Sequence, residues 1–332
     1  MPLPVVLSMS PPKVVEDVYK NVSDTMAAHQ LRYASRSQET LLDEIGAADY
    51  VLGDWSAELK LDRTALEAAR RAKVVVHPTA GYDSIDVAAA QELGLPVANR
   101  PGANASGVAE WAAMAALVSM KNVIPNHERL REGEWRMVEA PFEGVYEIKD
   151  RCLGVVGFGA IGQGVAKRLA GFGLSEILYF DLFVDVEEIE GGIAVRRVET
   201  MDELFERSDV VSLHLPLTAE TRNLVSQQKL EKLGPDGVLI NTARGGVVDE
   251  QALYDARASR KIKAAALDVF SQEPLTGPHQ WADLDNVLLS PHLAGSTLES
   301  IERMISGSLA AIDGAISGVL PDTVVNGVDT LR

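Results

Sequence analysis

One segment near the middle of the chain limits its fold more than any other, residues 153–181, LGVVGFGAIGQGVAKRLAGFGLSEILYFD. It contains a short apolar run suited to a buried parallel strand, a glycine-rich turn, a helical pattern, and a second apolar run that ends on an acid. Gly157, Gly159 and Gly162 have the spacing in which the first glycine permits a tight turn, the second lets the backbone approach a pyrophosphate, and the third lets helix and strand pack closely. Asp181 stands where an acid can bond a ribose 2′-hydroxyl. The segment therefore predicts a Rossmann dinucleotide site.

The alternative is a flexible glycine turn in another kind of α/β protein, which leaves Asp181 unexplained. The predicted helix after the turn directs its first N–H groups and its positive dipole end toward bound phosphates. Strand before, helix after and acid at the next strand end together favour the dinucleotide interpretation.

Charge and cysteine content exclude several classes of protein. The formal net charge of −17 repels phosphate backbones and anionic lipid, so we expect no nucleic-acid or membrane partner. An anionic substrate must then be captured locally, by an arginine or by backbone N–H groups. The single cysteine, Cys152, rules out an intrachain disulfide and is expected to be an inert buried thiol. The N-terminus reads as a first strand rather than a signal peptide, so we predict a cytoplasmic protein.

Strand and helix patterns alternate along the chain, which predicts parallel sheets. Several short strands precede the glycine motif, and a helix is expected over about 14–29. A second set of strands, which includes IAVRRV, begins at Leu153. A helix over about 297–317 is too long for an end cap, and we expect the tail after it to return to the first domain. The predicted fold class is therefore α/β, with two Rossmann/flavodoxin-like parallel-sheet domains separated by an active-site cleft, the first domain discontinuous.

A helix of small apolar residues is predicted over 104–120, and a stretch with little pattern follows it as far as Asp150. Long irregular stretches in compact domains are usually functional or interfacial. We therefore predict that the chain forms a homodimer through the 104–150 region.

Three predicted strand ends carry polar residues, and parallel sheets place their ligands at such ends. Arg244 follows the strand GVLINTA and could hold a carboxylate with both guanidinium nitrogens. Asp268 lies late in AAALDVF, and Glu273 follows it. His292 ends VLLSPH, and histidine is the natural acid or base near neutral pH. Taken singly, each could be an ordinary surface arginine, a solvated carboxylate or a structural histidine.

The order of the blocks NTARGGVVDE, ALDVFSQEP and SPHLAGST after GFGAIG resembles that of the D-isomer-specific 2-hydroxyacid dehydrogenases. HPTAGYDSID and VANRPGANASGVAEW resemble the family's blocks ahead of the glycine motif, so the resemblance covers nearly the whole chain. It implies a substrate-binding domain over 1–103 and 296–332 and an NAD-binding domain over 104–295.

The resemblance implies a catalytic set of Arg244, Glu273 and His292. Arg244 would bind the substrate carboxylate and polarise the C2 oxygen. His292 would give that oxygen a proton during reduction of a 2-oxoacid and take it back during oxidation. Glu273 would orient the imidazole and favour its charged form. Hydride would pass between NAD(H) and C2 of a small D-2-hydroxy acid or 2-oxoacid.

The resemblance also assigns binding roles to other positions. They are Gly157, Gly159, Ala160, Ile161 and Gly162 at the pyrophosphate turn, Asp181 at the adenosine ribose, Leu215 near the adenine, Thr242 and Asp268 near the nicotinamide, and Ala80 and Gly81 at the substrate carboxylate. The other five histidines, His29, His77, His127, His214 and His279, are expected to be structural.

Two positions favour particular ligands within the family. Asp181 is followed by Leu182 and Phe183, with no arginine to accept a 2′-phosphate, so NAD is expected rather than NADP. Phosphoglycerate-type members tend to have an arginine in the loop that here reads Asp54-Trp55-Ser56. We therefore expect a substrate with a neutral, apolar or aromatic side group, unless these residues only pack the loop.

No metal is expected. The alternative function is a non-catalytic NAD(H)-sensing scaffold of the corepressor type.

Overall fold

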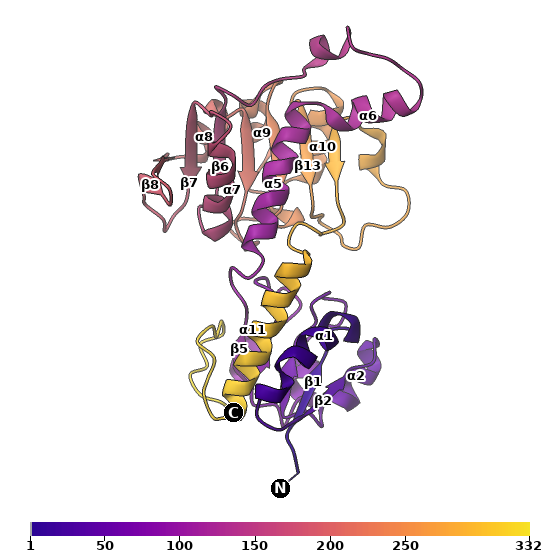
Figure 1. Ribbon diagram of the computed structural model, residues 1–332, viewed down its shortest axis with the longest axis vertical. Coiled ribbons are helices and arrows are strands. Elements are labelled where there is room, and N and C mark those ends of the chain that lie inside the picture. The colour runs from indigo at the N-terminus through magenta and orange to yellow at the C-terminus, as the bar shows by residue number, and fades with distance from the viewer. Residues whose placement is uncertain (1) are drawn as a thin grey trace. The chain divides into compact units, whose positions relative to one another are not determined.

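The computed structural model describes residues 2–332 (Figure 1). The chain divides into two compact units. The first unit extends to Asn104 and resumes at Thr297, and the second unit is Ala105–Ser296. Each unit is built on its own parallel sheet.

The first unit has a five-stranded parallel sheet in the order β2-β1-β3-β4-β5. Helices connect the strands, as parallel pairing requires. The strands are β1 (Val5–Ser8), β2 (Gln30–Tyr33), β3 (Tyr50–Leu52), β4 (Val75–Val76) and β5 (Val97–Ala98). The helices are α1 (Pro12–Val22), the 3₁₀ turn η1 (Ser23–Thr25), α2 (Gln38–Ile45), α3 (Arg63–Ala68), α4 (Val87–Glu92) and α11 (Leu298–Ile316).

Two apolar layers bury the faces of this sheet. Helices α1 and α11 cover one face, where Val15 and Ile305 belong to the same buried apolar cluster as Val6. Helices α2, α3 and α4 contribute to the other layer. The chain after α11 runs to the β5 edge, where the N–H of Val325 donates to the carbonyl of Val97 at 2.8 Å.

The second unit has a seven-stranded parallel sheet in the order β10-β7-β6-β11-β12-β13-β14, and a separate antiparallel pair, β8 and β9. Its strands are β6 (Cys152–Val156), β7 (Glu176–Phe180), β8 (Glu188–Ile189), β9 (Ile193–Ala194), β10 (Arg196–Arg197), β11 (Val210–Leu213), β12 (Val238–Asn241), β13 (Ala264–Leu267) and β14 (Val287–Leu289). Its helices are α5 (Ala105–Met120), α6 (Val123–Arg131), α7 (Ala160–Ala170), α8 (Met201–Arg207), α9 (Gln227–Leu233) and α10 (Glu250–Ala258), with 3₁₀ turns η2 (Ala140–Glu143), η3 (Gly245–Val247) and η4 (Gln280–Asp283).

Small residues bring α5 and α7 together on one face of this sheet, where Figure 1 shows them side by side. A side chain at Gly164 of α7 would place its Cβ 3.0 Å from the Cβ of Ala109 in α5. Helices α8, α9 and α10 cover the opposite face with apolar residues such as Phe205, Leu230 and Leu253. All five residues of β6 are buried, as expected for a central parallel strand.

The predicted α/β class with parallel sheets is confirmed, and three local expectations were wrong. The stretch after α5 contains a helix, α6. It starts after Asn122, a residue in the left-handed conformation (φ 48°). The segment IAVRRV does not form one strand, because β9 pairs with β8 and β10 joins the large sheet. Helix α1 ends at Val22, whose carbonyl accepts the Thr25 hydroxyl at 2.7 Å, before the predicted end near His29.

Candidate active site

The glycine turn between β6 and α7 has two glycines that the protein itself requires. Gly157 has φ +88°, and a Cβ there would lie 2.4 Å from the carbonyl oxygen of His214. A Cβ on Gly162 would lie 2.3 Å from the carbonyl oxygen of Gly157. Gly159 differs, since its φ is an ordinary −75° and no atom lies within 4 Å of a Cβ built on it. Open space in front of Gly159 suits a ligand that approaches the backbone closely, which is how the turn fits a dinucleotide pyrophosphate.

Asp181 ties the glycine turn to the end of β7. Its carboxylate accepts the N–H of Phe158 at 2.7 Å, of Phe183 at 2.8 Å and of Val184 at 2.9 Å. Burial opposes ionisation, but these three donors and the charge of Arg197 outweigh it and lower the pKa of Asp181. The carboxylate is therefore a fixed negative charge beside the turn.

His214, which we expected to be only structural, links the ends of β11 and β12. Its Nε2 lies 2.8 Å from the Ser212 hydroxyl, and its Nδ1 lies 3.3 Å from the hydroxyl of Thr242. Burial lowers the pKa of His214 to about 3, so the ring is neutral and one nitrogen donates while the other accepts. Leu215, the next residue, packs on the core beneath β11. A polar residue directly after the apolar run VVSL was the available sequence signal.

His292 and Glu273 form a hydrogen-bonded pair. The Nδ1 atom of His292 lies 2.7 Å from Oε2 of Glu273, and the other carboxylate oxygen of Glu273 accepts the N–H of Phe270 at 2.8 Å. Burial opposes the charge on Glu273, but the bond from His292, the Phe270 N–H and the charges of His292 and Arg244 lower its pKa. Because Nδ1 faces Glu273, Nε2 is the ring nitrogen that can meet another group.

Asp268, at the end of β13, holds the loop that carries His292. Its carboxylate accepts the N–H of Leu293 at 2.7 Å, the N–H of Ala294 at 2.9 Å and the hydroxyl of Ser290. Its carbonyl oxygen accepts the N–H of His292 at 2.8 Å. Burial raises the pKa of Asp268, although these donors oppose the shift. The bonds hold His292 in a left-handed conformation (φ 55°), which is uncommon for a residue with a side chain.

Arg244 begins the loop after β12. Its Nη1 donates to the carbonyl of Ala243 at 2.7 Å, and its own carbonyl accepts the amide of Asn241 at 3.0 Å. A Cβ on Gly245 would lie 1.9 Å from the carbonyl carbon of Phe270, so only glycine lets the Arg244 loop pack against the chain before Glu273. Because β12, β13 and β14 are neighbours, the loops of Arg244, Glu273 and His292 leave the same edge of the sheet.

The Ala80 and Gly81 turn lies in the first unit, after β4. The carbonyl of Ala80 accepts the side-chain amide of Asn99, and the carbonyl of Gly81 accepts the hydroxyl of Thr79, both at 2.7 Å. These bonds fix the turn. The neighbouring loop after β3 contains Asp54, which is buried and paired with Arg36, a residue that our sequence reasoning did not consider.

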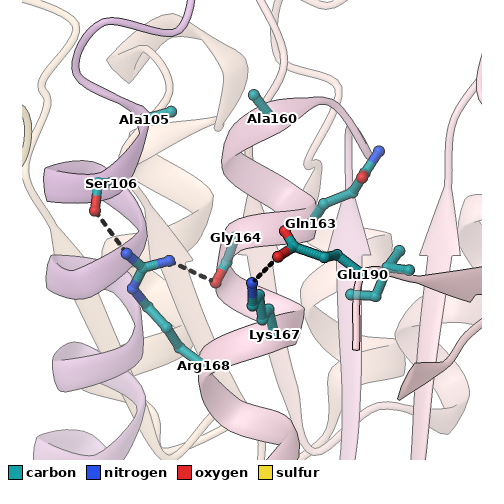
Figure 2. Close-up of a pocket in the computed structure, with 9 residues that line it drawn as sticks. Ala105, Ser106, Ala160, Gln163, Gly164, Lys167, Arg168 and Glu190 are labelled. Atoms are coloured by element: carbon teal, nitrogen blue, oxygen red, sulfur yellow. Dashed lines mark hydrogen bonds and ion pairs between the residues drawn. The ribbon is translucent and has the colours of Figure 1, made fainter. Parts of the chain in front are cut away.

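A hollow of about 320 Å³ lies along the outer side of α7, between α5 and the β8–β9 pair (Figure 2). It contains two cations, and each has a partner. Lys167 pairs with Glu190 at 2.9 Å, and Arg168 bonds the Ser106 hydroxyl at 2.7 Å and meets Glu110 at 3.1 Å. Both charges are thus balanced locally, and of the predicted cofactor residues only Ala160 lines the hollow.

Among residues 2–332 no three His, Cys, Asp or Glu side chains are grouped so that they could hold a metal ion. None of the described helices combines the length and the apolar character that a membrane crossing needs.

The sequence model of the D-isomer specific 2-hydroxyacid dehydrogenase, NAD binding domain, matches residues 113–294. The glyoxylate reductase of Thermofilum pendens is 35% identical over 307 residues, which are 91% of this chain and 88% of that protein. This chain belongs to the D-isomer-specific 2-hydroxyacid dehydrogenase family. The family resemblance expected from the sequence is therefore confirmed.

Two other matches lie in the same family. The D-3-phosphoglycerate dehydrogenase of Methanocaldococcus jannaschii is 36% identical over 292 residues, which are 87% of this chain and 54% of that protein. The crystal structure of 2-hydroxyacid dehydrogenase from Ketogulonicigenium vulgare Y25 matches with a TM-score of 0.80 and 30% identity, over 98% of this chain and 99% of that one. The matches support a 2-hydroxyacid dehydrogenase oxidoreductase that binds NAD or NADP.

Proposed function

We propose that this family member is an NAD-dependent D-2-hydroxyacid dehydrogenase that interconverts a small 2-oxoacid and its D-2-hydroxy acid. The observation that carries the proposal is the His292–Glu273 pair at 2.7 Å, on the same sheet edge as Arg244. An imidazole held by a carboxylate beside a guanidinium combines a proton donor with a site for an anionic substrate.

Each of the three residues has a distinct role in the proposed reaction. Arg244 binds the substrate carboxylate and polarises the C2 oxygen, because its guanidinium is always charged and matches a carboxylate in shape. His292 uses Nε2 to give a proton to that oxygen in reduction and to remove it in oxidation. Glu273 orients the imidazole through Nδ1 and stabilises its positive charge. The family resemblance assigns backbone N–H groups of Ala80 and Gly81 to the substrate carboxylate as well.

The cofactor fits the turn at Gly159 and the carboxylate of Asp181, and it supplies or accepts the hydride when bound. Asp181 holds three N–H donors and keeps lone-pair capacity for a ribose hydroxyl. A 2′-phosphate would meet this fixed negative charge, and the neighbouring Leu182 and Phe183 are exposed apolar side chains. These features favour NAD over NADP. Leu215 would border the adenine, and Thr242 and Asp268 would border the nicotinamide.

The proposed substrate is a small 2-oxoacid without a distal phosphate. Glyoxylate, named in the T. pendens relative, is the smallest such acid. In the loop that would face the substrate's side group, Asp54 is an acid and Trp55 an indole, so neither offers a cation to a phosphate.

We also propose a homodimer formed through the 104–150 region. This region exposes large apolar side chains that a monomer would leave in water. They are Met114, Val123, Leu130, Trp135, Met137, Val138 and Phe142. A second copy of the chain that covers them would remove this surface from solvent, and sedimentation analysis at micromolar concentration tests the proposal.

The activity is tested with a panel of glyoxylate, pyruvate, hydroxypyruvate and 3-phosphohydroxypyruvate, each with NADH and with NADPH. We expect turnover of at least one unphosphorylated acid and a higher kcat/KM with NADH. Equal kcat/KM values for the two cofactors would refute the cofactor preference. Binding of NADH without turnover of any acid would favour the scaffold of the corepressor type instead.

A further inference from the structure

Arg36, in the loop after β2, connects three loops of the first unit. Its Nη1 donates to the carbonyl of Met9 at 2.6 Å, after β1. Its Nη2 lies 2.9 Å from Oδ2 of Asp54 and 2.6 Å from Oε2 of Glu58, both after β3. The same nitrogen lies 2.8 Å from the Ser56 hydroxyl. The two outer nitrogens of the guanidinium therefore meet four oxygen acceptors.

The two carboxylates beside Arg36 differ in their freedom to move. Asp54 is fully buried, and its carboxylate also accepts the N–H of Leu59 at 2.9 Å and the N–H of Ser56 at 3.2 Å. Glu58 is exposed over 71% of its side chain. Asp54 is thus a fixed part of the loop, whereas Glu58 can be changed without disturbing the core.

Asp54 and Glu58 lie in the loop next to the one that carries the turn to which we assign the substrate carboxylate. Strands β3 and β4 are direct neighbours, so the loops that follow them leave the same edge about 5 Å apart. The loops also pack together, since a Cβ on Gly53 would lie 2.5 Å from Nδ1 of His77. The loop that carries Asp54 and Glu58 thus leaves the sheet beside the loop that carries the Ala80 and Gly81 turn. We take this as the side toward which the far end of a 2-oxoacid held at that turn extends.

The charges in this group do not favour an anion. One guanidinium and two carboxylates give a net charge of −1 when all are ionised. An arginine binds phosphate with two parallel N–H bonds, but the Nη donors of Arg36 already face four acceptors. A phosphate monoester carries about −1.5 to −2 charges at neutral pH and would meet Glu58 before it could compete for Arg36.

We propose that Arg36, Asp54 and Glu58 form a specificity filter, in which two carboxylates neutralise the arginine and so exclude 2-oxoacids with a distal phosphate. Glu58 is the member to vary, because its replacement by the neutral glutamine leaves one cation and one anion in the group. The inference rests on the proposed function, since it assumes that the Ala80 and Gly81 turn binds the 2-oxoacid carboxylate.

The test compares two substrates that differ only in the distal phosphate, hydroxypyruvate and 3-phosphohydroxypyruvate, with NADH. In Glu58→Gln we expect the ratio of kcat/KM for the phosphorylated over the unphosphorylated acid to rise about tenfold, mainly through KM. The matched control is Glu92→Gln. Glu92 is exposed and pairs with Arg63 at 2.7 Å, but it ends α4 rather than belonging to these loops, so the ratio should change less than about twofold.

A binding measurement separates failure of the filter from failure of the enzyme. Calorimetry with 3-phosphoglycerate and glycerate, on protein loaded with NAD, should show the same rise in preference for the phosphorylated acid in Glu58→Gln. An unchanged kcat/KM ratio with active enzyme would overturn the filter and leave the proposed function intact. If no acid were turned over, the proposed function would fail, and an unchanged binding preference would overturn the filter as well. Wild-type enzyme that uses both acids equally would also contradict it.

Discussion

The three glycines of the turn after β6 should respond differently to the same substitution, alanine. At Gly162 the new Cβ would lie 2.3 Å from a backbone oxygen and 2.9 Å from Cγ1 of Val155. Helix α7 would have to move away from β6, and overpacking of this kind costs about 1–3 kcal/mol. At Gly157 a contact of 2.4 Å adds to the penalty of about 1–2 kcal/mol for the left-handed backbone.

At Gly159 the protein offers no obstacle, because no atom lies within 4 Å of the new Cβ. Alanine reduces the entropy of the unfolded chain, which stabilises by about 0.4–1 kcal/mol, and it is a poorer N-cap for α7, which costs a similar amount. The free energy of unfolding should therefore change by less than about 1 kcal/mol. The dinucleotide, however, would meet the methyl group, and we expect NADH affinity to fall about 10- to 100-fold, or about 1.4–2.8 kcal/mol.

Urea unfolding of the protein without cofactor, followed by fluorescence titration with NADH, measures both quantities. Gly162→Ala should unfold at a lower urea concentration than the wild type. Gly159→Ala should unfold at the same urea concentration as the wild type but bind NADH weakly. The reasoning would be refuted if Gly159→Ala bound NADH like the wild type, or if it lost as much stability as Gly162→Ala.

Three further experiments test other parts of the account. Glu273→Gln replaces the carboxylate at His292 by a neutral amide and removes a charge-assisted hydrogen bond. We expect kcat for 2-oxoacid reduction to fall about 10- to 100-fold with little change in NADH affinity. An unchanged kcat would contradict the role of the pair. Burial lowers the pKa of Lys263 to about 8, below the value of 10.5 expected in the unfolded chain, so between these pH values the unfolded chain binds more protons than the folded protein. The free energy of unfolding of the wild type, relative to that of Lys263→Met, should therefore rise from pH 8 to pH 10.5. A difference that stays constant over this range would contradict the shift. Burial raises the pKa of Cys152 to about 11, so iodoacetamide at pH 8 should label it only after unfolding, and rapid labelling of native protein would show that it is not inert.

Local patterns predicted much of the fold and of the candidate site. The spacing of the glycines predicted two close backbone approaches that no other residue type permits, at Gly157 and Gly162. The apolar runs before Arg244 and His292 gave strand ends, and parallel neighbours bring such ends to one edge. These features could be predicted because each depends on residues close in sequence and on the general geometry of parallel sheets.

Contacts between distant segments could not be predicted in the same way. Asp268 meets the N–H groups of Leu293 and Ala294 only because β13 pairs with β14 in one particular register. Arg36 can reach Asp54 because only β1 lies between their two strands in the sheet, and the sequence does not state this strand order. These contacts arise from tertiary pairing, which leaves no local signal.

The central claim is that His292 transfers the proton while other residues hold the cofactor. The most direct measurement compares wild type and His292→Gln in 2-oxoacid-dependent oxidation of NADH, together with the Kd for NADH. The account predicts that turnover falls at least about 100-fold while the Kd for NADH changes less than about threefold. Turnover that survives the substitution would contradict the claim and would require another proton donor.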